Sequence, residues 1–449
     1  SPPGPLLWLG AEDASFASEA DFSGYSITRL TANQWLALPS SDDQVFPWLY
    51  VHGDALPDTP LNTLDRLERC AAPDGVLVME LPWLLADNGL SALRASSLAA
   101  LLANLGWVPS VIVGERAGPS GVLAFRKQGT PSRYRLSTPT AADTEECQAL
   151  FQRAFQEPVK PGLWEWKYGE GRAVSVIARR GQELVAHYGC ASRAIRLLGQ
   201  AACAVQICDV MVDPAERAVM TKTGAFFNAA KASQESIIGY GDRHLFGYGF
   251  PNHRHMRLGQ RAGLYEEVER LVELRWTPRH GTSSLRFMLR PVQAVKAYER
   301  QIDRLWAAMA ADLADRIVGV RDAAYLHYRY ESHPAHVYHL FLLRHRWTRQ
   351  ALGLLVLRRE GDCCRLIDLV GPLRCITLMV GYARRIAADW GVTTLLAWIT
   401  AGQARWLATG DEDMAATDIY IPGNCYIERV PVTELKNRWW LMMGDTDFL

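Results

Sequence analysis

The hydrophobic pattern of the first 130 residues alternates between short buried strands and amphipathic helices. Three apolar runs have the length and the branched or aromatic content of buried strands, at residues 6–9, 46–52 and 76–81. Residues 62–70 and 90–105 show helical spacing, and Gly106 stands where a left-handed residue commonly ends a helix. Because strands that alternate with helices favour a parallel sheet, we expect residues 1–130 to form a Rossmann-like α/β domain.

A polar linker at residues 128–135 leads into a longer stretch with a different pattern. Residues 138–155 predict a strand followed by a helix, and residues 182–189 lie in a predicted strand hairpin. The pattern then predicts a long strand, a helix, a further strand and a second helix, at residues 201–213, 224–235, 237–250 and 252–262.

A weak internal repeat of about 160 residues indicates that a second copy of this unit follows. Residues 164–168 and 326–330 both alternate aromatic and basic side chains, and both precede a predicted hairpin. We therefore predict tandem domains at 133–290 and 291–449. The second is expected to contain a linking helix, a hairpin, a strand, a helix and a final strand, at residues 291–313, 337–358, 368–372, 378–390 and 439–443.

Composition and charge exclude some functions. Lys+Arg and Asp+Glu both number 48, whereas a nucleic-acid-binding protein normally carries a basic excess. No apolar run reaches the roughly 18 to 20 residues of a membrane helix, so no membrane span is expected. The first basic residue is Arg29, which does not suit a secretory leader. Nine cysteines without a C-x-x-C pair predict reduced thiols in a cytoplasmic protein.

Two segments carry motifs that belong together. Val212, Pro214 and Arg217 form V-x-P-x-x-R at the end of the predicted long strand. Asn252 then opens a helix that Gly263 and Leu264 close. Together the two segments resemble the signature of the GNAT N-acyltransferases, in which V-x-P-x-x-R is followed by N-x-x-A-x-x-x-Y-x-x-G-F. This resemblance implies acetyl-CoA or another acyl-CoA as cofactor and an amine, on a small molecule or a carrier, as acceptor.

The resemblance also implies which residues hold the cofactor. The backbone of Met211 and Val212 would bind the pantetheine arm and polarise the thioester carbonyl, and Asn252 would hydrogen-bond the same arm. A turn that enters a helix favours anions through its free N–H groups, so this turn would hold the pyrophosphate. Its candidate residues, with a cation from the later helix, are Arg217, Thr221, Lys222, Thr223, Gly224, Ala225 and Arg257.

Each of these assignments has a structural alternative. The loop after Arg217 is longer and poorer in glycine than the family's R-G-x-G-x-G/A, and a helix start with a threonine cap would explain it equally. Asn252 is also a good helix N-cap, and both roles are compatible. Arg257, like Arg254, would otherwise belong to a solvated helix face.

The catalytic residues are less clearly indicated. The family often places a tyrosine, which protonates the leaving thiolate, where this chain has Gly259. Tyr248 and His255 are the nearby candidates, with His253 and Tyr265 as further ones. A base with a pKa near the working pH is also needed, and the candidates are Glu165, His187 and Glu183. Glu165 lies between two tryptophans, where burial would raise its pKa, or else it is an exposed acid.

The N-terminal region resembles a class I SAM-dependent methyltransferase. Phe46–Gly53 and Pro73–Val78 stand where that family has two of its strands. The family's Gly-x-Gly-x-Gly turn after the first strand is reduced to Gly10, and no acid ends the second strand at 27–31. We therefore do not expect SAM to bind.

The histidines at 333, 336 and 339 cannot all share one face of a strand, so no metal site is expected. We expect an acyl-CoA-dependent N-acyltransferase with the cofactor in the first GNAT-like copy and a cofactor-free second copy. A non-catalytic binding scaffold built from the same folds is the alternative, and a bifunctional methyl- and acyltransferase is a weaker one. The oligomeric state is left open.

Overall fold

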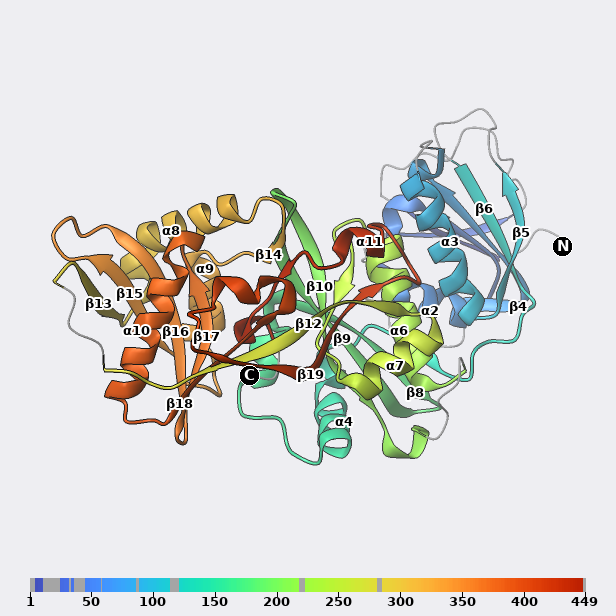
Figure 1. Cartoon of the computed structure of the whole chain (residues 1–449). Coiled ribbons are helices and arrows are strands. Elements are labelled where there is room, and N and C mark those ends of the chain that lie inside the picture. The colour runs from blue at the N-terminus through green and yellow to red at the C-terminus, as the bar shows by residue number, and fades with distance from the viewer. Residues whose placement is uncertain are drawn as a thin grey trace. The chain divides into compact units, whose positions relative to one another are not determined.

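The structure is a computed structural model and describes residues 5–10, 25–31, 34–35, 45–57, 59–85, 89–113, 121–217, 223–280 and 285–446. The chain divides into two compact units. The first contains Ser1–Pro158, Ser175–Gly189 and Asp209–Arg243, and the second contains Val159–Val174, Cys190–Cys208 and His244–Leu449. Figure 1 shows the elements of each unit along the chain.

The N-terminal part of the first unit is built on a six-stranded sheet, here sheet A, of order β2-β1-β3-β4-β6-β5. The first four strands in this order pair in parallel, whereas β6 pairs antiparallel with both β4 and β5. The parallel pairing and the three expected strands are therefore confirmed. Its elements are β1 (Pro5–Leu9), β2 (Ser26–Leu30), β3 (Phe46–His52), α2 (Leu61–Cys70), β4 (Ala71–Leu81), α3 (Gly89–Asn104), β5 (Trp107–Val113) and β6 (Gly121–Lys127).

The sequence Pro73-Asp74-Gly75, which favours a turn, lies inside β4. Asp74 has a φ of 60°, and the pairing of β3 with β4 shifts register between Phe46 and Trp48. A residue in the left-handed region can be accommodated as an irregularity between paired strands. The Pro-Asp-Gly sequence therefore interrupts this strand without ending it.

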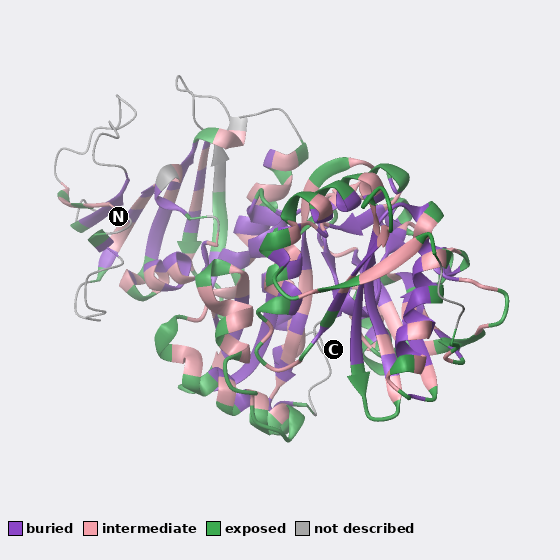
Figure 2. Ribbon diagram, turned by 90° about the vertical axis from the view of Figure 1, so that its left-hand side faces the viewer, coloured by how far each residue is buried: buried purple, intermediate pink, exposed green. Residues whose placement is uncertain are grey.

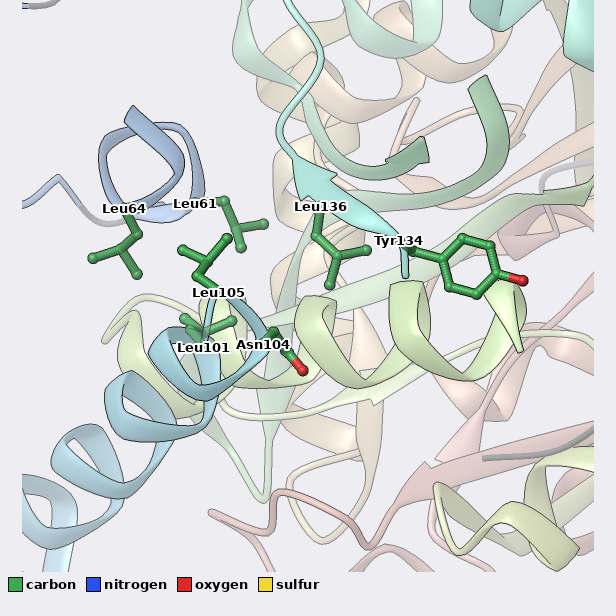
Figure 3. A pocket seen from close by; sticks show the side chains of 7 residues that line it. All are labelled: Leu61, Leu64, Leu101, Asn104, Leu105, Tyr134 and Leu136. Atoms are coloured by element: carbon green, nitrogen blue, oxygen red, sulfur yellow. The ribbon is translucent and has the colours of Figure 1, made fainter. Parts of the chain in front are cut away.

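Helices α2 and α3 pack against later elements of the same unit. The Asn62 side chain donates to the Thr138 carbonyl at 2.9 Å and accepts from its N–H at 2.8 Å. Helix α3 packs on η6 (Gln234–Tyr240), where Arg94 lies 5.2 Å from the centre of the Tyr240 ring. Figure 3 shows a small cavity between α2, α3 and β7 (Arg135–Ser137), lined by Leu61, Leu64, Leu101, Asn104, Leu105, Tyr134 and Leu136.

A second, seven-stranded sheet, here sheet B, has the order β11-β10-β9-β14-β20, with β8 pairing β9 and β7 pairing β8. Three helices belong to this part of the chain: α4 (Thr144–Phe155), α5 (Leu163–Tyr168) and α6 (Ala225–Ser233). The remaining strands of sheet B are β8 (Ala173–Arg180), β9 (Glu183–Leu197), β10 (Gln200–Val212), β11 (Gly247–Tyr248), β14 (Ile317–Gly319) and β20 (Trp439–Trp440).

The strand expected within 237–250 is mostly helical. Helix α6 continues directly into η6, a π-helix in which every residue is buried, and only Gly247–Tyr248 form a strand. A helix segment buried on all sides presents the same apolar run as a buried strand. The hydrophobic periodicity of residues 237–250 could therefore not distinguish a buried helix from a buried strand.

A third, seven-stranded sheet, here sheet C, has the order β13-β15-β16-β17-β18-β12-β19 and lies in the second unit. The expected helix at 291–313 begins later, after β13 has ended. The elements are α7 (His253–Ala262), β12 (Tyr265–Trp276), β13 (Phe287–Val292), α8 (Glu299–Asp312), α9 (Ala323–Leu326), η8 (His327–Glu331), β15 (His339–His345), β16 (Ala351–Glu360), β17 (Cys363–Val370), α10 (Ile376–Asp389), β18 (Thr394–Thr400), β19 (Asp413–Asn424) and α11 (Val432–Leu435).

Sheets B and C repeat one order of elements, which is hairpin, strand, helix and parallel strand. In both, the strand before the helix pairs in parallel with the strand after it, as β10 does with β11 and β17 with β18. Trp166 and Tyr328, from the two repeated aromatic–basic segments, stack at 4.7 Å and donate reciprocally to each other's carbonyls at 3.0 and 3.2 Å. These features support tandem domains. The division of the chain into domains at 133–290 and 291–449 stays a prediction.

The cores consist of the sheets and the inner faces of their helices, and Figure 2 shows the strands largely buried. In the second unit the core also encloses charges. Arg321, Asp368 and Asp445 are fully buried, and Arg321 forms an ion pair with each of the two carboxylates. The nine cysteines are free thiols. Within the described residues, no helix combines the length and apolarity needed to cross a bilayer.

Candidate active site

The end of β10 departs from regular strand geometry in the first unit. Asp209 has a φ of 44°, and its carbonyl lies 2.8 Å from Nδ1 of the buried His187 on β9. A left-handed residue within a strand turns nearby backbone groups out of the ladder, as in a β-bulge. The hydrogen bond makes Nδ1 a protonated nitrogen of His187, because a carbonyl only accepts. Met211 and Val212 follow this irregularity directly.

A short turn, η5 (Pro214–Glu216), follows β10 and is fixed by Asp213. The Asp213 side chain accepts from the Ala215 N–H at 3.0 Å and from Arg153 of α4 at 2.8 Å. Burial acts to raise the pKa of this carboxyl, but the two hydrogen bonds outweigh it and hold the pKa below its usual value. Asp213 is therefore ionised at neutral pH and caps the turn.

Glu216, the fifth residue of the V-x-P-x-x-R segment, anchors the same turn. Its carboxylate is buried and accepts from the Tyr134 hydroxyl at 2.5 Å. Arg180 of β8 forms a close ion pair with it, and Arg133 lies at 3.4 Å. One carboxylate thus joins the turn to β7 and β8. The sequence pattern did not single out this residue.

Arg217 was expected to reach a phosphate. Its guanidinium instead donates to the Val212 carbonyl at 3.1 Å and to the Ala154 carbonyl at 2.9 Å, and the side chain is largely exposed. These bonds hold the turn against the end of α4. A direct role in phosphate binding stays a prediction.

Helix α6 begins after the loop that follows this turn. Its N-cap is Gly224, with extended backbone and no side-chain hydrogen bond to the first turn, so the threonine cap considered as an alternative is not formed. The helix dipole favours an anion at this N-terminus. Ala225 is buried and Thr223 is exposed, while Thr221 and Lys222 lie outside the described residues.

The second unit contains the other half of the resemblance, at the start of α7. The Asn252 side chain accepts from the His255 N–H at 3.0 Å, so its role as N-cap is confirmed. His255 and Arg257 are both exposed on this helix. Cofactor contacts by these residues stay predictions.

Gly259 stands at the family's tyrosine position, and its lack of a side chain has a clear packing reason. A Cβ atom there would lie 1.9 Å from the Tyr265 ring. Tyr265 thus fills the space over Gly259, and its hydroxyl donates to the His255 carbonyl at 2.9 Å. Burial raises the pKa of Tyr265 far above its usual value.

Two further catalytic candidates lie in the second unit. Tyr248 is buried against Trp439, and its hydroxyl donates to the Gln206 side chain at 3.3 Å. Burial raises the pKa of Tyr248, so it is protonated at neutral pH. Glu165 is exposed on α5, so the buried alternative is not what the structure shows. On this short helix Trp166 faces Tyr328 and leaves Glu165 in solvent.

The corresponding turn of the second copy is occupied by the chain's own carboxylate. After β17, the Leu373 N–H donates to Asp312 Oδ2 at 2.8 Å, and Arg374 is exposed. An acid at this position would repel a phosphate. Within the described part of the chain, no cluster of three or more potential ligand side chains could hold a metal ion.

Comparisons with known proteins agree with this geometry. Residues 135–222, from β7 to the loop after β10, match the family model for an acetyltransferase (GNAT) domain. The fold is similar to a probable N-acyltransferase from Enterococcus faecalis V583, with 12% identity over 68% of this chain and 74% of that chain at a TM-score of 0.51. This likeness shows the fold alone, whereas the domain match supports an acyltransferase enzyme.

Two GCN5-related N-acetyltransferases are also similar. The one from Kribbella flavida has 14% identity over 65% of this chain and 70% of that chain, at a TM-score of 0.48. The one from Anabaena variabilis ATCC 29413 has 13% identity over 64% of this chain and 72% of that chain, at 0.49. No curated protein sequence matches the chain.

Proposed function

We propose that the protein transfers an acyl group, most simply acetyl, from coenzyme A to an amine. The observation that carries this proposal is the segment from β10 to α6, which lies mostly inside the matched GNAT domain. It combines a strand irregularity at Asp209, an anchored turn at Glu216 and a helix start without a side-chain cap. Backbone donors of this kind suit a thioester oxygen and a pyrophosphate.

The acceptor amine loses a proton as it attacks the thioester carbon, and the CoA thiolate gains one when it leaves. His187 is our candidate base, since its Nδ1–H bond leaves Nε2 as the acceptor nitrogen. Tyr248, Tyr265 and His255 are candidate acids, and Glu165, exposed on α5, is a second candidate base. In this proposal Met211, Val212, Thr221, Lys222, Thr223, Gly224 and Ala225 bind the cofactor, and a contribution from Asn252 and Arg257 rests on the sequence resemblance alone.

Acyl transfer can be measured by release of free thiol from acetyl-CoA with a panel of small and carrier-bound amines. We expect amine-dependent thiol release, and we expect His187→Ala to lower kcat by about 10²- to 10⁴-fold if it is the base. His244→Ala is a control, because His244 is also buried but bonds Ser192. No release with any amine, alongside tight CoA binding, would favour the non-catalytic scaffold, for which Gly259 in the tyrosine position is the supporting observation.

The N-terminal domain is proposed to bind no SAM. A Cβ at Gly10 would lie 2.4 Å from the Trp8 ring, so this indole covers the only glycine left of the family's turn. Trp8 also stacks on Tyr50 at 6.5 Å, which fixes the ring at the carboxyl ends of β1 and β3. Parallel α/β sheets bind ligands at this edge.

We therefore expect calorimetric titration of SAM into the whole protein to give no heat of binding. Acetyl-CoA titrated into the same preparation is the positive control. A micromolar dissociation constant for SAM would contradict this prediction and revive a bifunctional enzyme.

A further inference from the structure

Arginines without acidic partners gather at one end of sheet C. Arg290 lies on the edge strand β13, Arg344 on its neighbour β15, and Arg346 and Arg349 in the turn before β16. None of the four has a carboxylate within ion-pair distance among the residues the structure describes, and three of them are exposed. Residues 285–298 and 339–359 contain no Asp or Glu at all.

Two large apolar side chains are exposed at the same place. Trp347, at the tip of the turn, is 66% exposed, and Leu285 is 75% exposed. The Arg346 N–H donates to the Arg286 carbonyl at 2.7 Å, which brings Leu285 beside this turn. We call Leu285, Arg290, Arg344, Arg346, Trp347 and Arg349 the arginine–tryptophan tip.

The tip departs from the rest of the surface in its charge pattern. Elsewhere arginines are commonly paired, as Arg179 is with Asp143 and Glu146 and Arg384 with Asp411. A cluster of unpaired cations in a chain of zero net charge raises the local positive potential. The complementary partner is therefore anionic.

The types of residue in the tip indicate the chemical class of its anionic partner. All four cations are arginines, whose planar guanidinium suits the geometry of phosphate oxygens. A peptide strand added to β13 is disfavoured, because Pro291 within this edge strand lacks an N–H. Of the two exposed apolar side chains, Trp347 alone offers a ring for base stacking, whereas Leu285 suits an aliphatic environment. Tryptophan with arginine and an aliphatic side chain instead suits the interface of a lipid bilayer.

We propose that the arginine–tryptophan tip docks the protein on an anionic phospholipid surface. Trp347 and Leu285 enter the boundary between headgroups and acyl chains, and the arginines pair with lipid phosphates. The contact is peripheral and reversible, because two apolar side chains bury little surface. This inference does not depend on acyl transfer.

The test is flotation of the full-length protein with large unilamellar vesicles. Vesicles of phosphatidylcholine containing phosphatidylglycerol are compared with pure phosphatidylcholine at low and at physiological salt. One variant combines Arg346→Glu and Arg349→Glu, and a second variant carries Trp347→Ala. The matched control is Arg359→Glu with Arg405→Glu, which changes net charge equally at two other exposed positions of the same unit. Circular dichroism melts establish that every variant is folded.

We expect binding to the anionic vesicles only, weakened by salt. The Arg346/Arg349 double variant is expected to lose about tenfold or more in apparent affinity, Trp347→Ala several-fold, and the control little. Absence of binding to phosphatidylglycerol vesicles overturns the proposal, as does an equal loss in the control. Binding of polyuridylate that is tighter than binding of the anionic vesicles, and that is lost in the Arg346/Arg349 double variant, would overturn it in favour of a nucleic-acid surface.

Discussion

Replacing Asp445 with alanine is expected to lower the free energy of unfolding of the second unit by about 3 to 5 kcal/mol. The Asp445 carboxylate is fully buried and pairs closely with Arg321, while Arg193 lies at 3.4 Å. It also accepts from the Met442 N–H at 2.9 Å. Its removal leaves two guanidiniums in the core with less compensation, and desolvated charges without partners are costly.

Scanning calorimetry of the whole protein measures this effect as a fall in the melting temperature of one transition, by roughly 6 to 20 °C. Asp389→Ala is the control, because Asp389 forms only long surface contacts with Arg385 at 4.0 Å and His280 at 3.5 Å. Exposed pairs contribute about 0 to 1 kcal/mol. Equal shifts for the two variants would show that the buried network does not stabilise the core.

Replacing Glu216 with alanine is expected to weaken acetyl-CoA binding about five- to a hundredfold, which corresponds to roughly 1 to 3 kcal/mol. The carboxylate joins the turn after β10 to Tyr134 and Arg180, and without it the turn is no longer held at its base. Such a loss acts on the Kd and KM for acyl-CoA and leaves the KM for the amine largely unchanged. An effect on the KM for acyl-CoA without an effect on the KM for the amine would show that Glu216 positions the turn, because general damage to the fold would change both.

Glu183→Ala is the matched control for this experiment. Glu183 also faces Arg180, at 4.0 Å, but its side chain is 61% exposed. Glu216→Gln is expected to be intermediate, since an amide accepts from Tyr134 but cannot form the ion pair with Arg180. If Glu183→Ala weakened CoA binding as much as Glu216→Ala, the anchoring role assigned to Glu216 would be wrong.

The local sequence pattern predicted the structure correctly where the neighbours in sequence determine a segment's conformation or where both of its faces are buried. The buried strands β1, β3 and β4 were recognised because both of their faces are apolar, and Asn252 was recognised because capping depends on neighbours in sequence. Features that depend on distant partners were missed. Glu216 meets Tyr134, 82 positions away, and nothing in the sequence links the two.

The same dependence on residues far away in the sequence explains the other differences between the predictions and the structure. Strand β12 pairs between β18 and β19, although both come more than a hundred residues later, because strand pairing is decided by tertiary contacts. From the sequence, Gly259 indicated the loss of a catalytic tyrosine. The structure shows that the Tyr265 ring occupies the space that a side chain at position 259 would need. For Glu165 the sequence left a buried and an exposed acid open, and the structure shows it exposed, because a single helical turn places adjacent residues on different sides.

The most direct test of acyl-CoA binding by the β10–α6 segment is a calorimetric titration of coenzyme A into the wild type and three variants. We expect Lys222→Ala and Arg217→Ala each to weaken binding by roughly 1 to 3 kcal/mol, the first through lost charge and the second through a loosened turn. Arg374→Ala, at the turn that Asp312 already occupies, is expected to leave affinity unchanged. If Arg374→Ala abolished binding while the other two did not, the cofactor would belong to the second copy and our account would be contradicted.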